Sequence, residues 1–114
     1  MNIESLQDLQ RQIQNSSAGL FYFSTSDCNV CKVLKPKVEE LLSQSFPKME
    51  FYYIDCEAYP DVAAQFQVFT VPTLIAYFDG REAFRKSRSV GIQELASAIQ
   101  RPYTMLFDEK NNTD

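Results

Sequence analysis

Residues 20–36 read LFYFSTSDCNVCKVLKP, and the fold is most clearly encoded in this segment. It opens with the apolar run Leu20–Phe23, which is too short for a buried helix and rich in aromatic side chains. Such a run predicts a central β-strand that is covered on both faces. The polar turn Ser24–Asp27 offers several helix N-caps. A helix is expected over about residues 28–43, with a bend at Pro36. The two cysteines of the segment therefore lie at a strand-to-helix junction.

The spacing of apolar residues predicts the other elements outward from this segment. An amphipathic helix is expected over residues 2–15, a strand over 49–55, a short helix over 60–66, and a β-hairpin over 73–90 that turns at Asp79-Gly80. A last helix should follow Gly91, ahead of a tail over 101–114. This order predicts one α/β domain over residues 1–114, with its core in 1–100. We expect a four-stranded mixed sheet in the order 2-1-3-4, with helices on both faces.

Composition excludes several classes of protein. The chain has 114 residues, a net charge of −4, three cysteines and no histidine. The acidic balance argues against binding to nucleic acid or to an anionic membrane. Without histidine, Ser-His-Asp and Cys-His catalysis are excluded, as are most zinc enzymes. The N-terminus lacks the features of a signal peptide, and no apolar run approaches the roughly 18 residues of a membrane span. We therefore expect a cytoplasmic protein.

Cys28 and Cys31 form a CxxC pair on one helical turn. A thiolate on Cys28 would face the free N–H groups and the positive end of the helix dipole, which lowers its pKa. Cys31 is placed to attack a mixed disulfide on Cys28, so exchange needs no metal, base or cofactor. A structural thiol pair and a metal half-site are the alternatives, and the second would need two chains. Cys56 is interpreted as core filler.

Over residues 1–100 the chain resembles the thioredoxin family. The resemblance is carried by the CxxC pair followed by Lys32 and Pro36, by the tripeptide Val71-Pro72-Thr73, and by the Asp79-Gly80 turn with Gly91. It implies a thioredoxin fold in which Pro72 is cis and faces the cysteines, while Val71 offers its backbone to an extended substrate. The expected substrate-binding residues are Asn29, Val30, Val71 and Pro72. The expected partners are proteins with disulfides and a thioredoxin-reductase-like or thiol reductant.

The chain departs from the family pattern at four places. Asp27 stands where the family usually has tryptophan, and it could cap the helix or raise the pKa of Cys28. Asp27 and Lys32 are thus the residues expected to tune the pair. The buried acid of the family aligns with Tyr22, here interpreted as core, and its lysine partner aligns with Phe51. The sequence predicts no counterpart of the family's first edge strand, which would leave residues 49–55 as an exposed edge. We therefore expect the segment Tyr103–Phe107 to pack against the body, or the edge to pair with another chain, giving a monomer or an edge-strand dimer.

Two functions remain open on these grounds. One is a thiol–disulfide oxidoreductase that reduces protein disulfides through a mixed disulfide on Cys28, resolved by Cys31. The other is a thioredoxin-like adaptor that binds partners at the Val71-Pro72 groove with little or no redox turnover.

Overall fold

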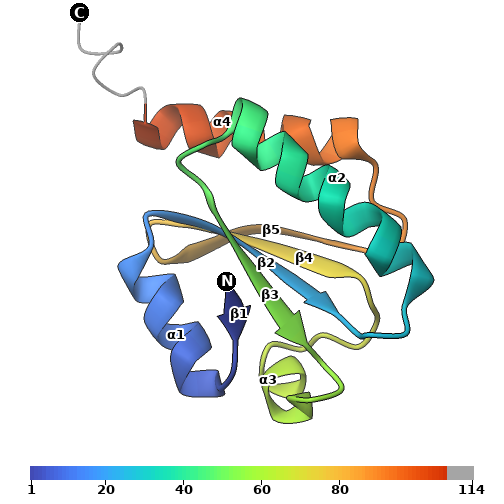
Figure 1. Cartoon of the computed structure of the whole chain (residues 1–114). Helices are drawn as coiled ribbons and strands as arrows, with labels where there is room; N and C mark the ends of the chain where they lie inside the picture. Colours follow the sequence, from blue (N-terminus) through green and yellow to red (C-terminus); the bar gives the residue numbers. More distant parts are fainter. Residues whose placement is uncertain (108–114) are drawn as a thin grey trace, which may run out of the picture.

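The computed structural model describes residues 1–107, and in them five strands form one mixed sheet with the order β1-β3-β2-β4-β5 (Figure 1). The strands are β1 (Asn2–Ile3), β2 (Ala18–Ser24), β3 (Glu50–Asp55), β4 (Thr73–Phe78) and β5 (Arg81–Ser87), and the helices are α1 (Leu6–Asn15), α2 (Asn29–Ser45), α3 (Pro60–Gln65) and α4 (Ile92–Phe107). Strand β2 pairs in parallel with β3 and antiparallel with β4, and β4 pairs antiparallel with β5. The predicted order of these four strands is confirmed.

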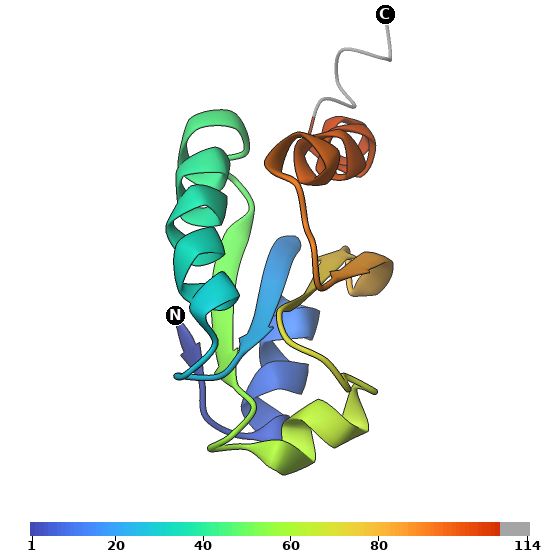
Figure 2. The same ribbon diagram turned by 90° about the vertical axis from the view of Figure 1, so that its right-hand side faces the viewer.

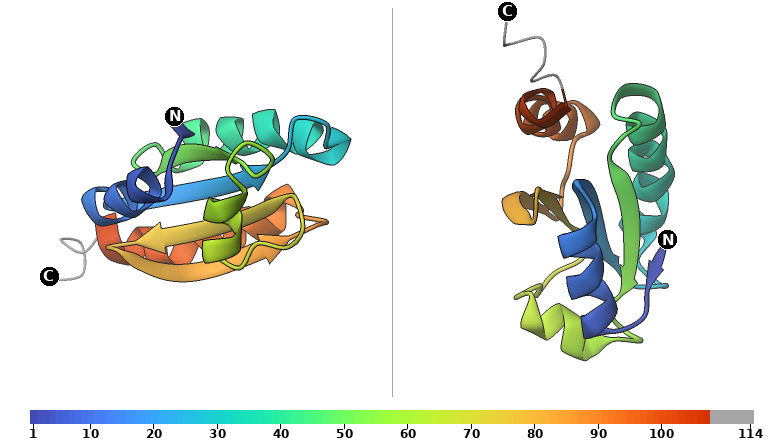
Figure 3. Two further views of the ribbon diagram at one scale, coloured as in Figure 1. Left: turned by 90° about the horizontal axis from the view of Figure 1, so that it is seen from below. Right: turned by 90° about the vertical axis from the view of Figure 1, so that its left-hand side faces the viewer.

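Helices cover both faces of the sheet, as expected. Helices α2 and α4 lie on one side, and α1 and α3 lie on the other (Figures 1 and 2). The view from below in Figure 3 shows α1 and α3 in front of the strands. Every residue of β2 is buried. Because successive side chains of a strand point to opposite faces, Leu20 and Tyr22 pack under α2 and α4, while Phe21 and Phe23 pack against α1 and α3. The run of four apolar residues therefore supplies both cores.

The expected missing edge strand is present, so the prediction of a four-stranded sheet is wrong. Residues 2 and 3 form β1, which pairs in parallel with Tyr53 and Ile54 of β3. The Tyr53 N–H also donates to the Met1 carbonyl at 2.8 Å. Strand β1 is too short to show the alternation of side chains that is typical of a strand. Ile3 also stands three residues before Leu6, a helical spacing, so the sequence pattern predicts that the helix begins near residue 2. The helix begins only at Leu6, where the Ser5 hydroxyl accepts the Asp8 N–H at 3.0 Å.

The last helix is longer than the sequence predicts. Proline usually ends a helix, but α4 continues through Pro102 to Phe107. Packing holds this extension: the Tyr103 ring lies 5.0 Å from that of Phe46, and its hydroxyl accepts the Lys48 N–H at 3.1 Å. The expectation that residues 103–107 pack against the body is confirmed, although β1 and not this segment covers the edge of β3. The rest of the predicted tail, residues 108–114, lies outside the described residues.

Candidate functional site

The site begins where β2 ends and α2 starts. Cys28 and Cys31 are joined by a disulfide, with their Cα atoms 5.2 Å apart. Cys31 is 2% exposed and belongs to the core beneath α2, whereas Cys28 is half-buried and lies at the rim of that core. The two sulfurs of one bond therefore differ in access. A partner in solution can reach the Cys28 side of the pair, while Cys31 is covered.

Cys28 is itself the N-cap of α2. Its Sγ accepts the Cys31 N–H at 3.2 Å, and its carbonyl accepts the Lys32 N–H at 3.1 Å. The expectation that Asp27 could cap the helix is thus wrong, because the Asp27 carboxylate accepts the Thr25 hydroxyl at 2.9 Å within the preceding turn. Lys32 is exposed on the first turn of α2. The Cys28 sulfur occupies the position at which free N–H groups of a helix collect.

The loop before β4 supplies the second part of the site. The Val71-Pro72 bond is cis, as the resemblance implies. Two contacts hold this loop in place: the Thr73 hydroxyl donates to the Thr70 carbonyl at 2.7 Å, and the Arg88 N–H donates to the Pro72 carbonyl at 2.9 Å. Pro72 is buried and Val71 is half-buried. Cys28 and Val71 pack against the same hydrophobic cluster, which also contains Cys31.

An apolar groove of about 650 Å³ runs alongside the cysteine pair, between α2 and the loop from β5 to α4. Val30 and Val33 on its α2 wall are 60% and 59% exposed. Its lining residues are Asn29, Val30, Val33, Leu34, Lys37, Ser89, Val90, Gly91 and Ile92. Of these residues, the sequence predicts Asn29 and Val30 but not Val33 or the loop 89–92. An exposed valine between Lys32 and Lys37 on the polar side of α2 is the signal that could have pointed to the groove.

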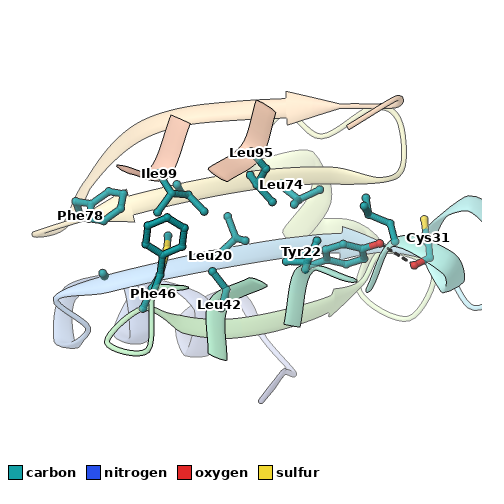
Figure 4. Close-up of a cluster of buried hydrophobic side chains, with 14 residues drawn as sticks. Leu20, Tyr22, Cys31, Leu42, Phe46, Leu74, Phe78, Leu95 and Ile99 are labelled. Atoms are coloured by element: carbon teal, nitrogen blue, oxygen red, sulfur yellow. Dashed lines mark hydrogen bonds between the residues drawn. The ribbon is translucent and has the colours of Figure 1, made fainter. Parts of the chain in front are cut away.

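Tyr22 lies directly beneath the cysteine pair. Its ring is fully buried, and its hydroxyl donates to the Cys31 carbonyl at 2.7 Å (Figure 4). Burial, and then the nearby Tyr53 and Glu39, raise the pKa of Tyr22 above its ordinary value. The hydroxyl therefore keeps its proton and remains a donor. The interpretation of Tyr22 as a core residue is confirmed, but it did not include this polar contact.

The third cysteine lies on the other side of the sheet from the pair. Phe21 and Phe23 form a hydrophobic cluster with Leu9 and Ile13 of α1 and Val62 and Ala63 of α3, here called the cluster of α1 and α3. Cys56 packs against this cluster and remains partly exposed, so it only partly fits the interpretation as core filler. Burial, followed by the adjacent Asp55, raises the pKa of its thiol to about 11.

Among residues 1–107, no group of three or more acidic, cysteine or histidine side chains could hold a metal ion. Within the same range, no helix has the length and apolar character to cross a membrane.

Comparison with known proteins agrees with this geometry. A family model described as thioredoxin matches residues 2–101. The thioredoxin-like protein YdfQ of Bacillus subtilis is 31% identical over 107 residues, which cover 94% of this chain and 95% of that protein. Thioredoxin of Chlamydia trachomatis is 35% identical over 81 residues, covering 71% of this chain and 76% of that one. The crystal structure of Fasciola hepatica thioredoxin superposes with a TM-score of 0.79 at 28% identity, covering 88% and 96% of the two chains.

Proposed function

Because the chain belongs to the thioredoxin family of thiol–disulfide oxidoreductases and carries the CxxC disulfide Cys28–Cys31, we propose that it reduces disulfide bonds in other proteins. The observation that carries the proposal is the unequal access of the two sulfurs. Cys28 is half-buried at the N-terminus of α2, while Cys31 is buried one turn further along. In such a pair, the more exposed sulfur can attack the disulfide of a partner protein, and the buried sulfur can then release the reduced partner from the mixed disulfide.

In the first step, the Cys28 thiolate attacks one sulfur of the substrate disulfide. A bond forms between Cys28 Sγ and that sulfur, the substrate S–S bond breaks, and the second substrate sulfur leaves as a thiolate that takes a proton from water. The position of Cys28 favours its thiolate form, since the Cys31 N–H points at the sulfur and the helix dipole adds positive charge there.

In the second step, Cys31 loses its proton to water and its sulfur attacks Cys28 Sγ. The Cys28–Cys31 bond forms, the mixed disulfide breaks, and the remaining substrate sulfur leaves and is protonated. The substrate has gained two electrons and two protons, and the enzyme has lost them.

Members of this family act on disulfide substrates and are returned to the dithiol form by reductase systems. For this chain we propose a thioredoxin-reductase-like protein or a thiol reductant in the cytoplasm.

The proposed substrate site combines Asn29, Val30, Val71 and Pro72. Val71 is half-buried beside the cluster that holds the cysteines, which supports main-chain pairing with an extended substrate segment. Asn29 and Val30 line the groove beside the disulfide, and its apolar wall suits a hydrophobic side chain next to the substrate cysteine. Asp27 and Lys32 flank the pair and are proposed to tune its redox equilibrium through their charges.

Reduction of insulin disulfides by dithiothreitol tests this function. The wild type is expected to accelerate the reaction, Cys28→Ser to abolish the acceleration, and Cys31→Ser to accumulate a covalent complex with an insulin chain. Cys56→Ser is the matched control and should keep the wild-type rate, because Cys56 lies on the other side of the sheet. A wild type no faster than dithiothreitol alone, or full activity in Cys28→Ser, would contradict the proposal and favour the adaptor function.

A further inference from the structure

We propose that Tyr22 is a positioning residue of the redox site: its hydroxyl holds the Cys31 carbonyl, and thereby keeps the buried sulfur in place to close the disulfide with Cys28. The direct observation is the hydrogen bond of 2.7 Å from the Tyr22 hydroxyl to the Cys31 carbonyl (Figure 4). It joins the middle of β2 to the first turn of α2. Both partners are buried, with Tyr22 at 0% and Cys31 at 2% exposure.

The first turn of α2 depends on such a contact because the helix is weakened just after it. In a regular helix the N–H of residue 36 would donate to the carbonyl of residue 32. Residue 36 is proline, which has no N–H, so Lys32 loses this link to the next turn. The turn that carries both cysteines is therefore less firmly joined to the rest of α2. The bond from Tyr22 ties it to the sheet instead.

The surroundings of Tyr22 fix the direction in which its hydroxyl points. Its ring lies 5.7 Å from that of Phe51 and 6.3 Å from that of Tyr53, both on β3. The Lys35 ammonium of α2 lies above these two rings, 5.9 Å from the Phe51 centroid and 5.5 Å from the Tyr53 centroid. A ring packed between a strand pair and a helix has little room to tilt. The hydroxyl consequently meets the Cys31 carbonyl in one orientation.

Cys31 is thus held at both ends of its main chain. Its N–H donates to Cys28 Sγ and its carbonyl accepts from Tyr22. When the disulfide is reduced, Cys31 would gain freedom if only the helix held it, and closing the bond again would cost that freedom. The bond from Tyr22 removes part of this cost in advance. It should therefore favour the closed disulfide over the open dithiol.

The test is the equilibrium between dithiol and disulfide in glutathione buffers, measured by mass spectrometry after acid quenching. Tyr22→Phe keeps the packed ring and removes only the hydroxyl. We expect the equilibrium constant for closing the disulfide to fall by up to about fivefold, the factor that corresponds to one neutral hydrogen bond, since whatever part of the bond persists in the dithiol cancels from the ratio. This fall is equivalent to a reduction potential about 20 mV higher, since tenfold corresponds to about 30 mV. Faster amide exchange over residues 29–33 of the reduced variant is expected as a second readout.

Tyr52→Phe is the matched control. Tyr52 is also fully buried, but its hydroxyl bonds Glu50 and Ser16 and its ring lies in the cluster of α1 and α3. It should lower the free energy of unfolding without moving the glutathione equilibrium. A fall of more than twofold in Tyr22→Phe alone supports the proposal. The proposal is overturned if the equilibrium constant of Tyr22→Phe is higher than that of the wild type or within twofold of it. It is also overturned if Tyr52→Phe lowers the constant equally, and in each case Tyr22 is a core residue only.

Discussion

Cys56 shows at the scale of one residue how the environment controls a thiol. Cys28 and Cys56 are both partly exposed, but only the Cys28 sulfur receives an N–H at the start of a helix. Cys56 lies beside the Asp55 carboxylate and is partly buried, and both effects disfavour a thiolate, raising its pKa from the ordinary 9.0 to about 11. The same side chain is therefore suited to exchange at one position and much less reactive at the other.

The reactivity of Cys56 toward iodoacetamide checks this difference. Only the thiolate reacts, so a pKa higher by two units reduces the rate at pH 8 by about a hundredfold. The rate should increase about tenfold per pH unit and continue to increase beyond pH 9. Mass spectrometry of the Cys28→Ser/Cys31→Ser variant isolates Cys56, and the same variant in urea provides the reference. A rate that is equal in the folded and unfolded chains, or that levels off near pH 9, would contradict the raised pKa.

At the scale of the element, the β4–β5 hairpin depends on its two-residue turn. Asp79 and Gly80 have φ values of 55° and 80°, the left-handed values that such a turn requires. The turn is also tied to the start of β2, since the Asp79 N–H donates to the Ser17 carbonyl at 2.8 Å. Because β4 ends in this turn and begins at the cis-proline loop, the register of the hairpin also places Val71 and Pro72.

Gly80→Ala tests the turn. A Cβ at position 80 meets no atom within 4 Å, so the expected loss of about 1–2 kcal/mol in unfolding free energy comes from the left-handed backbone alone. Gly91→Ala is the control, because its φ lies outside the left-handed region and a Cβ there would only touch that of Glu94 at 3.9 Å. Urea denaturation gives both values. A Gly80→Ala variant as stable as Gly91→Ala would show that the turn does not limit stability.

At the scale of the whole molecule, β1 closes the sheet on the side of β3. Ile3 is 2% exposed and packs into the cluster of α1 and α3, while its main chain pairs with Ile54. Two residues thus bring the N-terminal segment onto the sheet and cover part of an edge that carries Phe51, Tyr52 and Tyr53. An uncovered edge of this kind can pair with another chain.

Ile3→Ala is expected to lower the unfolding free energy by about 2–4 kcal/mol, since it leaves a cavity in a filled core. It should also promote concentration-dependent association through the loosened edge of β3. Asn2→Ala is the matched control on the exposed side of the same strand, and it should change stability by less than about 0.5 kcal/mol. Urea denaturation and size-exclusion chromatography check both effects. Equal stability of the two variants would mean that β1 contributes little to the fold.

Most of the fold and the chemistry of the site follow from local patterns. The run Leu20–Phe23 identified the central strand, the Asp79-Gly80 pair identified the hairpin, and the position of the CxxC pair after a strand identified the reactive group. Each signal is contained in a few neighbouring residues, because strand burial, turn geometry and helix capping depend on the local backbone. The cis bond at Pro72 came from the family resemblance and was confirmed.

The other features of the fold and of the site depend on contacts between residues far apart in sequence. Strand β1 exists because β3 offers it an edge, and α4 passes through Pro102 because Tyr103 packs on Phe46. In the sequence, the spacing of Ile3 and Leu6 predicts a helix where β1 lies, and Pro102 predicts a helix end where α4 continues. The bond from Tyr22 to Cys31 joins a strand to a helix, and its formation depends on how the two elements cross. Local sequence patterns thus specify the reactive pair and the core strands, whereas only long-range packing specifies what covers the sheet edge and what holds the Cys31 main chain.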